Sequence, residues 1–310
     1  HYWSSGCVAQ RLARLWKTPH VHMFHTLSRI KTAYAGTAPD PRRAHVELGL
    51  LDSANAIVVA TPIERAQIAA HYGPRRAPTV YIPCGIDPEP FATPARANTR
   101  RSGGRFVVTA LGRIERLKNF ELLLRAAARA MALEPRFVKD VEVRIAGGPS
   151  ADEPETLPAL LDLAAELGIE SQVRFLGAVP RKDVIALYAA SDLCVVPSRH
   201  ESFGLVALEA MAAGLPVVAT RTGGLQVTVE DGVNGYLVDI DDTEALAERL
   251  LLLWASPALR RELGARGARI AGRYAWPLIA KRMIDLYGTL VAEPSMVGQF
   301  GALRAIEGLG

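Results

Sequence analysis

The sequence has few cysteines and few lysines, and both shortages narrow the class of protein. The three cysteines, Cys7, Cys84 and Cys194, are odd in number and widely spaced, a pattern that does not fit a disulfide framework. We expect them to be small buried hydrophobes of a reduced, cytoplasmic protein. Only six of the basic residues are lysine, and the net charge is only +4. Because no basic cluster is long or interleaved with aromatics, we expect no nucleic-acid partner.

Long apolar runs are also missing. None reaches the roughly 18 residues of a membrane-spanning helix, and the features of a signal peptide are not seen. A chain of 310 residues with 49% hydrophobic residues has enough material for the cores of two domains.

Strands and helices are expected to alternate, which predicts an α/β fold with a parallel, doubly wound sheet. Strands are expected at 20–25, 56–60, 79–82, 106–111, 141–146, 173–176, 193–196, 216–219 and 236–238. Helices are expected at 4–16, 43–52, after the Thr61 N-cap, at 120–133, 157–167, 182–190, 202–214 and from 242 to about 292. A Pro-, Arg- and Gly-containing stretch, 88–104, is interpreted as a linker. We therefore expect domains at 1–92 and 93–274, and a last segment, 275–310, whose Gly-rich end is loosely ordered.

The chain is organised around residues 198–214. Glu201 follows an apolar strand, and Glu209 lies two turns into the next helix, for which Ser202 is the expected N-cap and Gly214 the stop. Ligands of open α/β sheets bind at this end of the strands. Three backbone N–H groups there would favour an anion, those of Phe203, Gly204 and Leu205. The alternative is two solvated glutamates without a shared role.

A second loop, 112–119, follows the strand at 106–111. Gly112 permits close backbone approach, and Arg113 and Lys118 place two cations on one loop. A flat guanidinium fork and a compact ammonium both suit phosphate oxygens. The alternative is a solvated basic loop that also contains Arg116.

These residues carry a resemblance to glycosyltransferase family 4. Glu201 and Glu209, with seven residues between them, resemble its E-x7-E motif, 112–119 resembles its G-R-x4-K-N signature, and 83–87 resembles its P-x-G-[IV]-D element. The resemblance covers nearly the whole chain and is strongest from 106 to 239. It implies a retaining enzyme of GT-B architecture, with two Rossmann-like domains that face a cleft and a last helix that crosses back to the first domain.

The resemblance also implies roles for the donor-binding residues. Arg113 and Lys118 would bind the donor diphosphate and stabilise the charge that grows as it leaves. Glu209 would accept hydrogen bonds from the ribose hydroxyls, and Glu201 would face the transferred sugar. The base would lie against 175–180, which could equally be a plain turn. The implied donor-binding set is Gly112, Val179, Phe203, Gly204, Leu205 and Glu209, and the catalytic set is His25, Arg113, Lys118 and Glu201.

His25 is expected at the end of a first-domain strand, in the F-H-[ST] context in which the family's histidine contacts the donor sugar. A purely structural histidine is the alternative. His20 and His22 raise the question of a metal, but positions i, i+2 and i+5 of a strand do not converge on one ion. We expect no metal and no cofactor beyond the nucleotide-sugar co-substrate.

Tyr2, Thr26 and Arg43 match residues that bind the acceptor phosphate in inositol-phosphate N-acetylglucosaminyltransferases of this family; sucrose-phosphate synthases share much of the stretch. A small phosphorylated acceptor is therefore suggested.

The chain opens at His1, where family members already have about a third of their first domain, so we expect an N-terminally truncated chain. The predicted function is transfer of a hexosyl group from a nucleotide sugar, with UDP-sugar favoured. The alternative is an incompetent fragment that only binds nucleotide sugar. A nicotinamide dehydrogenase is disfavoured, because 147–149 does not fit Gly-x-Gly-x-x-Gly.

Overall fold

A computed structural model describes residues 1–36, 38–92 and 104–292. Most of the expected linker and the whole expected loose end, 293–310, lie outside the described residues. By packing, the chain divides into two units, one of His1–Gly85 with the chain from Trp276 on, the other of Ile86–Ala275. Residues 86–92 thus pack with the second unit, and Phe91 is buried there against Tyr188. The domain limits 1–92, 93–274 and 275–310 remain our proposal.

The first unit contains a parallel sheet in the order β1-β2-β3, with β1 Val21–Met23, β2 Ala56–Val59 and β3 Thr79–Tyr81. Its helices are α1 Trp3–Trp16, α2 Ser28–Ala35, α3 Pro41–Ser53, α4 Pro62–Tyr72 and α13 Trp276–Ala292. Apolar side chains from β2 and from the helices α2, α3 and α4 form its core. The sequence patterns predicted these strands and most of the helices, but not α2.

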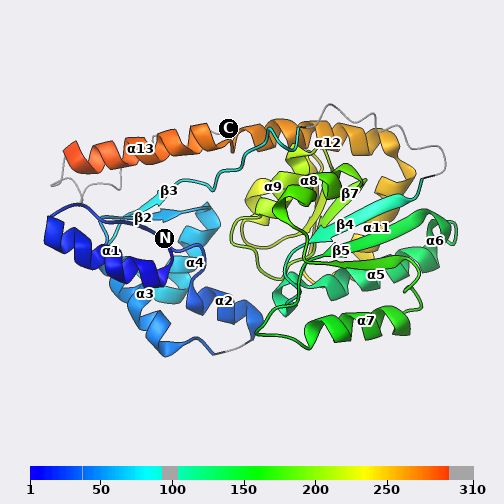
Figure 1. The fold of residues 1–310 in the computed structure, drawn as a ribbon, viewed down its shortest axis with the longest axis horizontal. Coiled ribbons are helices and arrows are strands. Elements are labelled where there is room, and N and C mark those ends of the chain that lie inside the picture. Colours follow the sequence, from blue (N-terminus) through cyan, green and yellow to red (C-terminus); the bar gives the residue numbers. More distant parts are fainter. Residues whose placement is uncertain (37, 93–103, 293–310) are drawn as a thin grey trace. The chain divides into compact units, whose positions relative to one another are not determined.

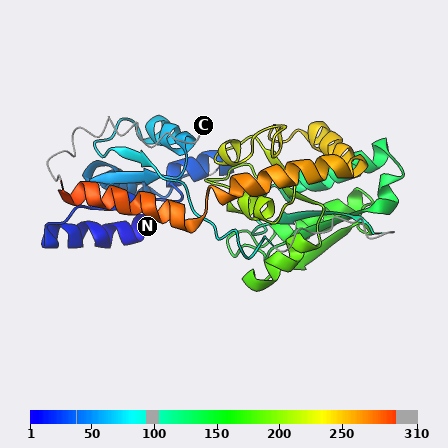
Figure 2. The same ribbon diagram turned by 90° about the horizontal axis from the view of Figure 1, so that it is seen from above.

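The apolar pattern of 4–16 predicts that α1 buries Val8, Leu12 and Leu15, but none of the three is fully buried. Val8 and Leu15 are 59% and 74% exposed, and Gly6 is the residue that α1 buries. Figure 2 shows α13 alongside α1. Side chains of both helices, with residues 18–21, line an apolar hollow of about 430 Å³. In β1 the alternating pattern predicts that Val21 and Met23 are buried. Met23 is buried, but so is His22, and Val21 is only half-buried.

The second unit contains a parallel sheet in the order β6-β5-β4-β7-β8-β9. The strands are β4 Phe106–Leu111, β5 Val141–Ala146, β6 Val173–Gly177, β7 Leu193–Val196, β8 Val217–Thr220 and β9 Gly235–Val238. The helices are η1 Arg116–Lys118, α5 Phe120–Leu133, α6 Phe137–Asp140, α7 Thr156–Glu166, α8 Arg181–Ala189, α9 Leu205–Ala212, α10 Leu225–Thr228, α11 Thr243–Ala255 and α12 Pro257–Gly272. Helix α11 packs against α5, and α12 packs against α9, so that helices cover the sheet (Figure 1).

The strand order places a topological switch point between β4 and β7. The chain runs outward from β4 through β5 to β6, and then returns to β7 on the other side of β4. At such a point the loops after the two central strands diverge and leave room for a ligand at the carboxyl edge. The loops after β4 and β7 are those that the sequence motifs singled out.

The two expected helix caps have different outcomes. Thr61 caps α4 as predicted by accepting the N–H of Glu64, but the Glu64 carboxylate reaches back to the N–H of Ala60. Ser202 does not cap α9. That helix begins after Gly204, whose φ of 96° lies in the left-handed region that glycine adopts readily.

The free cysteines are only partly as expected. Cys194 is buried, whereas Cys7 and Cys84 are half-buried. Burial raises the pKa of the Cys194 thiol to about 12 and that of Cys84 to about 11. In the described part of the chain no helix is long and apolar enough to cross a membrane.

Candidate active site

The loops after β4 and β7 are joined at the switch point. The N–H of Arg199 donates to the carbonyl of Leu117 at 2.8 Å. Close to this hydrogen bond in both loops, the Lys118 ammonium lies 2.7 Å from a carboxylate oxygen of Glu201. The two side chains are only 20% and 19% exposed, so their charges interact more strongly than a solvated surface pair would. The structure thus unites two residues that the sequence assigned to separate motifs.

Backbone geometry brings the β4 loop into this position. The single turn η1 carries Lys118, and Asn119 ends the turn in the left-handed conformation, with φ 51°. The next strand's loop presses from the other side, because a Cβ on Gly147 would lie 1.7 Å from the carbonyl oxygen of Gly112. Only glycine permits that approach. The Arg113 side chain is 65% exposed and pairs with Glu115 at 3.2 Å, so a ligand can reach its guanidinium.

A third loop, after β8, donates hydrogen bonds to the backbone of the loop that carries Glu201. The N–H of Gly224 donates to the Glu201 carbonyl at 2.8 Å, and the Thr222 hydroxyl donates to the Arg199 carbonyl at 2.9 Å. Added Cβ atoms would lie 2.0 Å from the Glu201 oxygen at Gly223 and 2.3 Å from Phe203 Cα at Gly224. The sequence analysis did not assign this Thr-Gly-Gly turn, although a glycine pair soon after a buried strand is a signal for close approach.

Asp241, just after β9, links the loops after β4 and β7. It accepts from Arg199 at 2.6 Å and from the Asn119 amide at 3.2 Å. Its own φ is 66°, a conformation that is uncommon outside glycine and that clusters at functional sites. We did not predict a role for it.

Glu209 is buried on α9 and pairs with Arg181, the first residue of α8. The Arg181 side chain is 67% exposed and stacks over the Phe91 ring, 5.5 Å from its centroid. The predicted hydroxyl-binding carboxylate therefore already has a cationic partner that sequence reasoning missed. Two elements far apart in sequence supply the pair, so no local spacing could have predicted it.

The other predicted donor-binding residues lie at the same carboxyl edge. Val179 is half-buried in the turn between β6 and α8. Phe203 is buried against Tyr274, with ring centroids 5.8 Å apart, whereas Leu205 is 42% exposed at the start of α9. The first N–H groups of a helix lack partners within it, so the α9 start retains the geometry for an anion.

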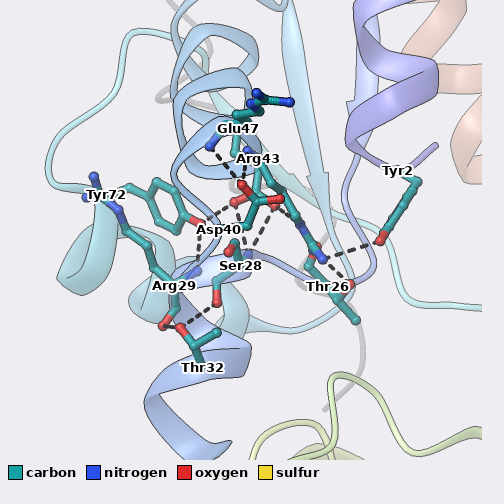
Figure 3. Close-up of polar contacts among 10 residues, drawn as sticks. Tyr2, Thr26, Ser28, Arg29, Thr32, Asp40, Arg43, Glu47 and Tyr72 are labelled. Carbon is teal, nitrogen blue, oxygen red and sulfur yellow. Dashed lines mark hydrogen bonds and ion pairs between the residues drawn. The ribbon is translucent and has the colours of Figure 1, made fainter. Parts of the chain in front are cut away.

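In the first unit the three predicted acceptor-binding residues come together (Figure 3). One terminal nitrogen of Arg43 donates to the carbonyl and the hydroxyl of Thr26, at 2.7 and 3.2 Å. The other donates to the Tyr2 hydroxyl at 3.3 Å, and the guanidinium lies 5.1 Å from the centroid of the Tyr2 ring. Asp40 caps the helix that carries Arg43 by accepting the N–H of Arg42 at 2.9 Å. A guanidinium fork with neighbouring hydroxyls suits a phosphate.

His25 lies two residues beyond β1, not within a strand. Its φ of 63° is unusual for a residue with a side chain, and such conformations are enriched at functional sites. Its Nε2 lies 2.8 Å from Nδ1 of His1, and the two rings stack with centroids 5.0 Å apart.

His20 and His22 are both buried in the first unit. Their rings meet edge to face at 5.6 Å, and burial lowers the pKa of His22 to about 3. No group of three or more potential metal-binding side chains occurs in the ranges that the structure describes.

In the second unit, burial lowers the pKa of His200, next to Glu201, to about 4.

The fold and these loops define a glycosyltransferase of the GT-B class. The structure is similar to sucrose-phosphate synthase from Thermosynechococcus elongatus, at 32% identity and a TM-score of 0.80, over 94% of this chain and 72% of that one. The family model described as "Glycosyl transferases group 1" matches residues 92–269, and "Glycosyltransferase Family 4" matches 1–90. The chain belongs to the group 1 glycosyl transferases, and the predicted family and enzyme class are confirmed.

Curated relatives are similar over nearly the whole chain. The D-inositol 3-phosphate glycosyltransferase of Corynebacterium urealyticum is 39% identical over 95% of this chain and 71% of its own length. The enzyme of the same name from Geodermatophilus obscurus is 39% identical over 99% of this chain and 68% of its own length. The Anabaena protein HepE, solved with UDP, shares the fold at 24% identity and a TM-score of 0.80, over 93% of this chain and 77% of that one.

Proposed function

We propose that this glycosyltransferase moves a hexosyl group, with retention, from a nucleotide sugar to a small phosphorylated acceptor, and that UDP-sugar is the favoured donor. The observation that carries the donor part is the Lys118–Glu201 pair, 2.7 Å apart at the switch point. A cation and a carboxylate held there can each bind one part of a sugar nucleotide. Lys118 takes the diphosphate, and Glu201 takes the sugar hydroxyls.

The residues of the donor loops have distinct tasks in this proposal. An ammonium has three N–H donors, so Lys118 can keep Glu201 and bind a phosphate oxygen together. Arg113 is exposed and adds a flat fork. Negative charge grows on the diphosphate as the glycosidic bond breaks, so two cations already in place stabilise the transition state more than the ground state.

The proposed reaction is a front-face substitution. The acceptor oxygen forms a bond to the anomeric carbon while the bond from that carbon to the diphosphate breaks. The departing phosphate oxygen takes the acceptor proton, and the products are the glycoside and the nucleoside diphosphate. Glu209 keeps its ion pair with Arg181 and accepts hydrogen bonds from the ribose hydroxyls. His25 orients the donor sugar.

The acceptor part is supported by the cluster of Arg43, Tyr2 and Thr26 and by the names of the relatives. Both curated relatives are D-inositol 3-phosphate glycosyltransferases, and the 32% identical solved structure is a sucrose-phosphate synthase. We also propose that the protein acts in the cytoplasm, since its described cysteines are free.

Calorimetric titration of the chain with UDP and with GDP, both with EDTA present, tests the donor part. We expect saturable binding of UDP that tolerates EDTA. No heat with either nucleotide up to millimolar concentration would refute the donor site. UDP-glucose, UDP-N-acetylglucosamine and GDP-mannose are then compared as donors for this chain and for a version extended upstream of His1. Binding without turnover in the shorter chain alone would favour the binding-only alternative.

A further inference from the structure

Glu47 is a fully buried carboxylate at the centre of the acceptor cluster (Figure 3). It lies one turn after Arg43 on α3 and accepts the Nε–H of that guanidinium at 2.7 Å. Both of its oxygens accept the backbone N–H of Ser28, at 3.1 and 3.0 Å. The Tyr72 hydroxyl donates to the same carboxylate. Groups from α2, α3 and α4 therefore converge on one side chain.

These contacts explain how a carboxylate stays buried. An ionised carboxylate without partners is very costly away from water, whereas this one has a cation, a hydroxyl and a helix N–H. Helix α2 has no side-chain cap of its own at Leu27, so Glu47 also places negative charge at the positive end of α2. Burial and the hydrogen bond to Glu47 raise the pKa of Tyr72, which keeps its hydroxyl protonated as a donor.

The network immobilises Arg43. Glu47 holds Nε, Thr26 holds one terminal nitrogen, and the side chain is only 14% exposed. A guanidinium is planar, so fixing two of its nitrogens fixes the plane. The remaining nitrogen donates to the Tyr2 hydroxyl at 3.3 Å and still has a second N–H for a ligand. Because this order exists before binding, little entropy is lost when an anion arrives.

We infer that Glu47 is a positioning residue that aims Arg43 at the phosphate of the acceptor, with Tyr72 as the group that locks Glu47. The inference rests on the proposed function, because it requires a phosphorylated acceptor. It adds that selectivity for the phosphate depends on a buried carboxylate that never touches it. A carboxylate in an anion site would ordinarily repel the anion. Here Glu47 acts through the orientation of Arg43, and it lies on the Nε side of the guanidinium.

The test measures binding of myo-inositol 3-phosphate and of myo-inositol to the full chain in the presence of UDP. Four variants are compared with the native chain: Glu47→Gln, Tyr72→Phe, Arg43→Ala and, as the matched control, Arg42→Ala. Arg42 is the exposed neighbour of Arg43, so its removal takes away the same charge outside the network. We expect Glu47→Gln to weaken inositol phosphate binding at least 10-fold, Tyr72→Phe to weaken it about 3-fold and Arg42→Ala to leave it within 2-fold.

Two readouts separate positioning from a merely structural role. UDP binding should stay unchanged in Glu47→Gln, and the double variant with Arg43→Ala should bind inositol phosphate no worse than Arg43→Ala alone, since Glu47 acts only through Arg43. Tyr72→Phe keeps the test decisive if Glu47→Gln does not fold. If Arg43→Ala abolishes the preference for the phosphate while Glu47→Gln and Tyr72→Phe keep it, the role of Glu47 is overturned and the acceptor proposal stands. If the native chain shows no preference for the phosphate, both are overturned.

Discussion

Replacing Gly223 by alanine should damage the candidate donor site although it replaces no residue assigned to bind the donor. The new Cβ would lie 2.0 Å from the carbonyl oxygen of Glu201, and real contacts of this kind stay beyond about 3 Å, so the Glu201 loop must retreat by roughly 1 Å. The φ of 43° adds strain of about 1–2 kcal/mol for an L-residue, and overpacking adds about 1–3 kcal/mol. A misplacement of about 1 Å lowers a catalysed rate by roughly 10²-fold.

Two matched glycines separate the causes in this prediction. Gly168 has a φ of 67° and nothing within 4 Å of an added Cβ, so Gly168→Ala should introduce backbone strain without a steric clash. Gly272, at the end of α12, has neither strain nor a neighbour, and Gly272→Ala should be neutral or stabilising by up to about 1 kcal/mol. Urea unfolding gives the stabilities, and sugar transfer or donor hydrolysis gives the rates. The reasoning fails if Gly223→Ala is no less stable than Gly168→Ala and turns over donor at the native rate.

Three further substitutions test charges. Lys118→Ala should lower the transfer rate about 10²–10³-fold, because it removes a preorganised cation, whereas Glu209→Ala should mainly raise the Kd for nucleotide; equal small effects on rate and binding would contradict these roles. In the first unit, burial raises the pKa of Glu64 to about 7, against the opposing hydrogen bond from Ala60. Because the native state then holds a proton that the unfolded chain has lost, the stability from Glu64 is full below about pH 4.5 and is lost as pH rises through 7, by about 3 kcal/mol in total. Urea melts from pH 5 to 8 should show this fall in the native protein and not in Glu64→Gln, and an unchanged slope in the variant would count against it.

The sequence by itself determined the α/β class, most strands of both sheets and the motifs of the donor loops. Buried parallel strands are short apolar runs between turn signals, and β4, β5 and β7 follow that pattern residue for residue. The placement of 112–119 and 198–204 after β4 and β7 was equally readable, because carboxyl ends of parallel strands share one edge. The pattern could not show that Lys118 and Glu201 form a pair, since the strand order that makes β4 and β7 neighbours is a property of the assembled sheet.

The tertiary structure decided whatever depends on close approach or on partners from distant elements. Ser202 has the right chemistry for an N-cap, but Gly204 occupies the N-cap position of α9. The backbone there adopts a left-handed conformation and packs tightly near Leu225. Arg181 meets Glu209, and Ser28 and Tyr72 meet Glu47, only because separate helices pack together. Glu47 read alone is one more glutamate of a polar helix. Its burial, and with it the orientation of Arg43, results from three helices converging on a single carboxylate, and no spacing along the chain encodes that.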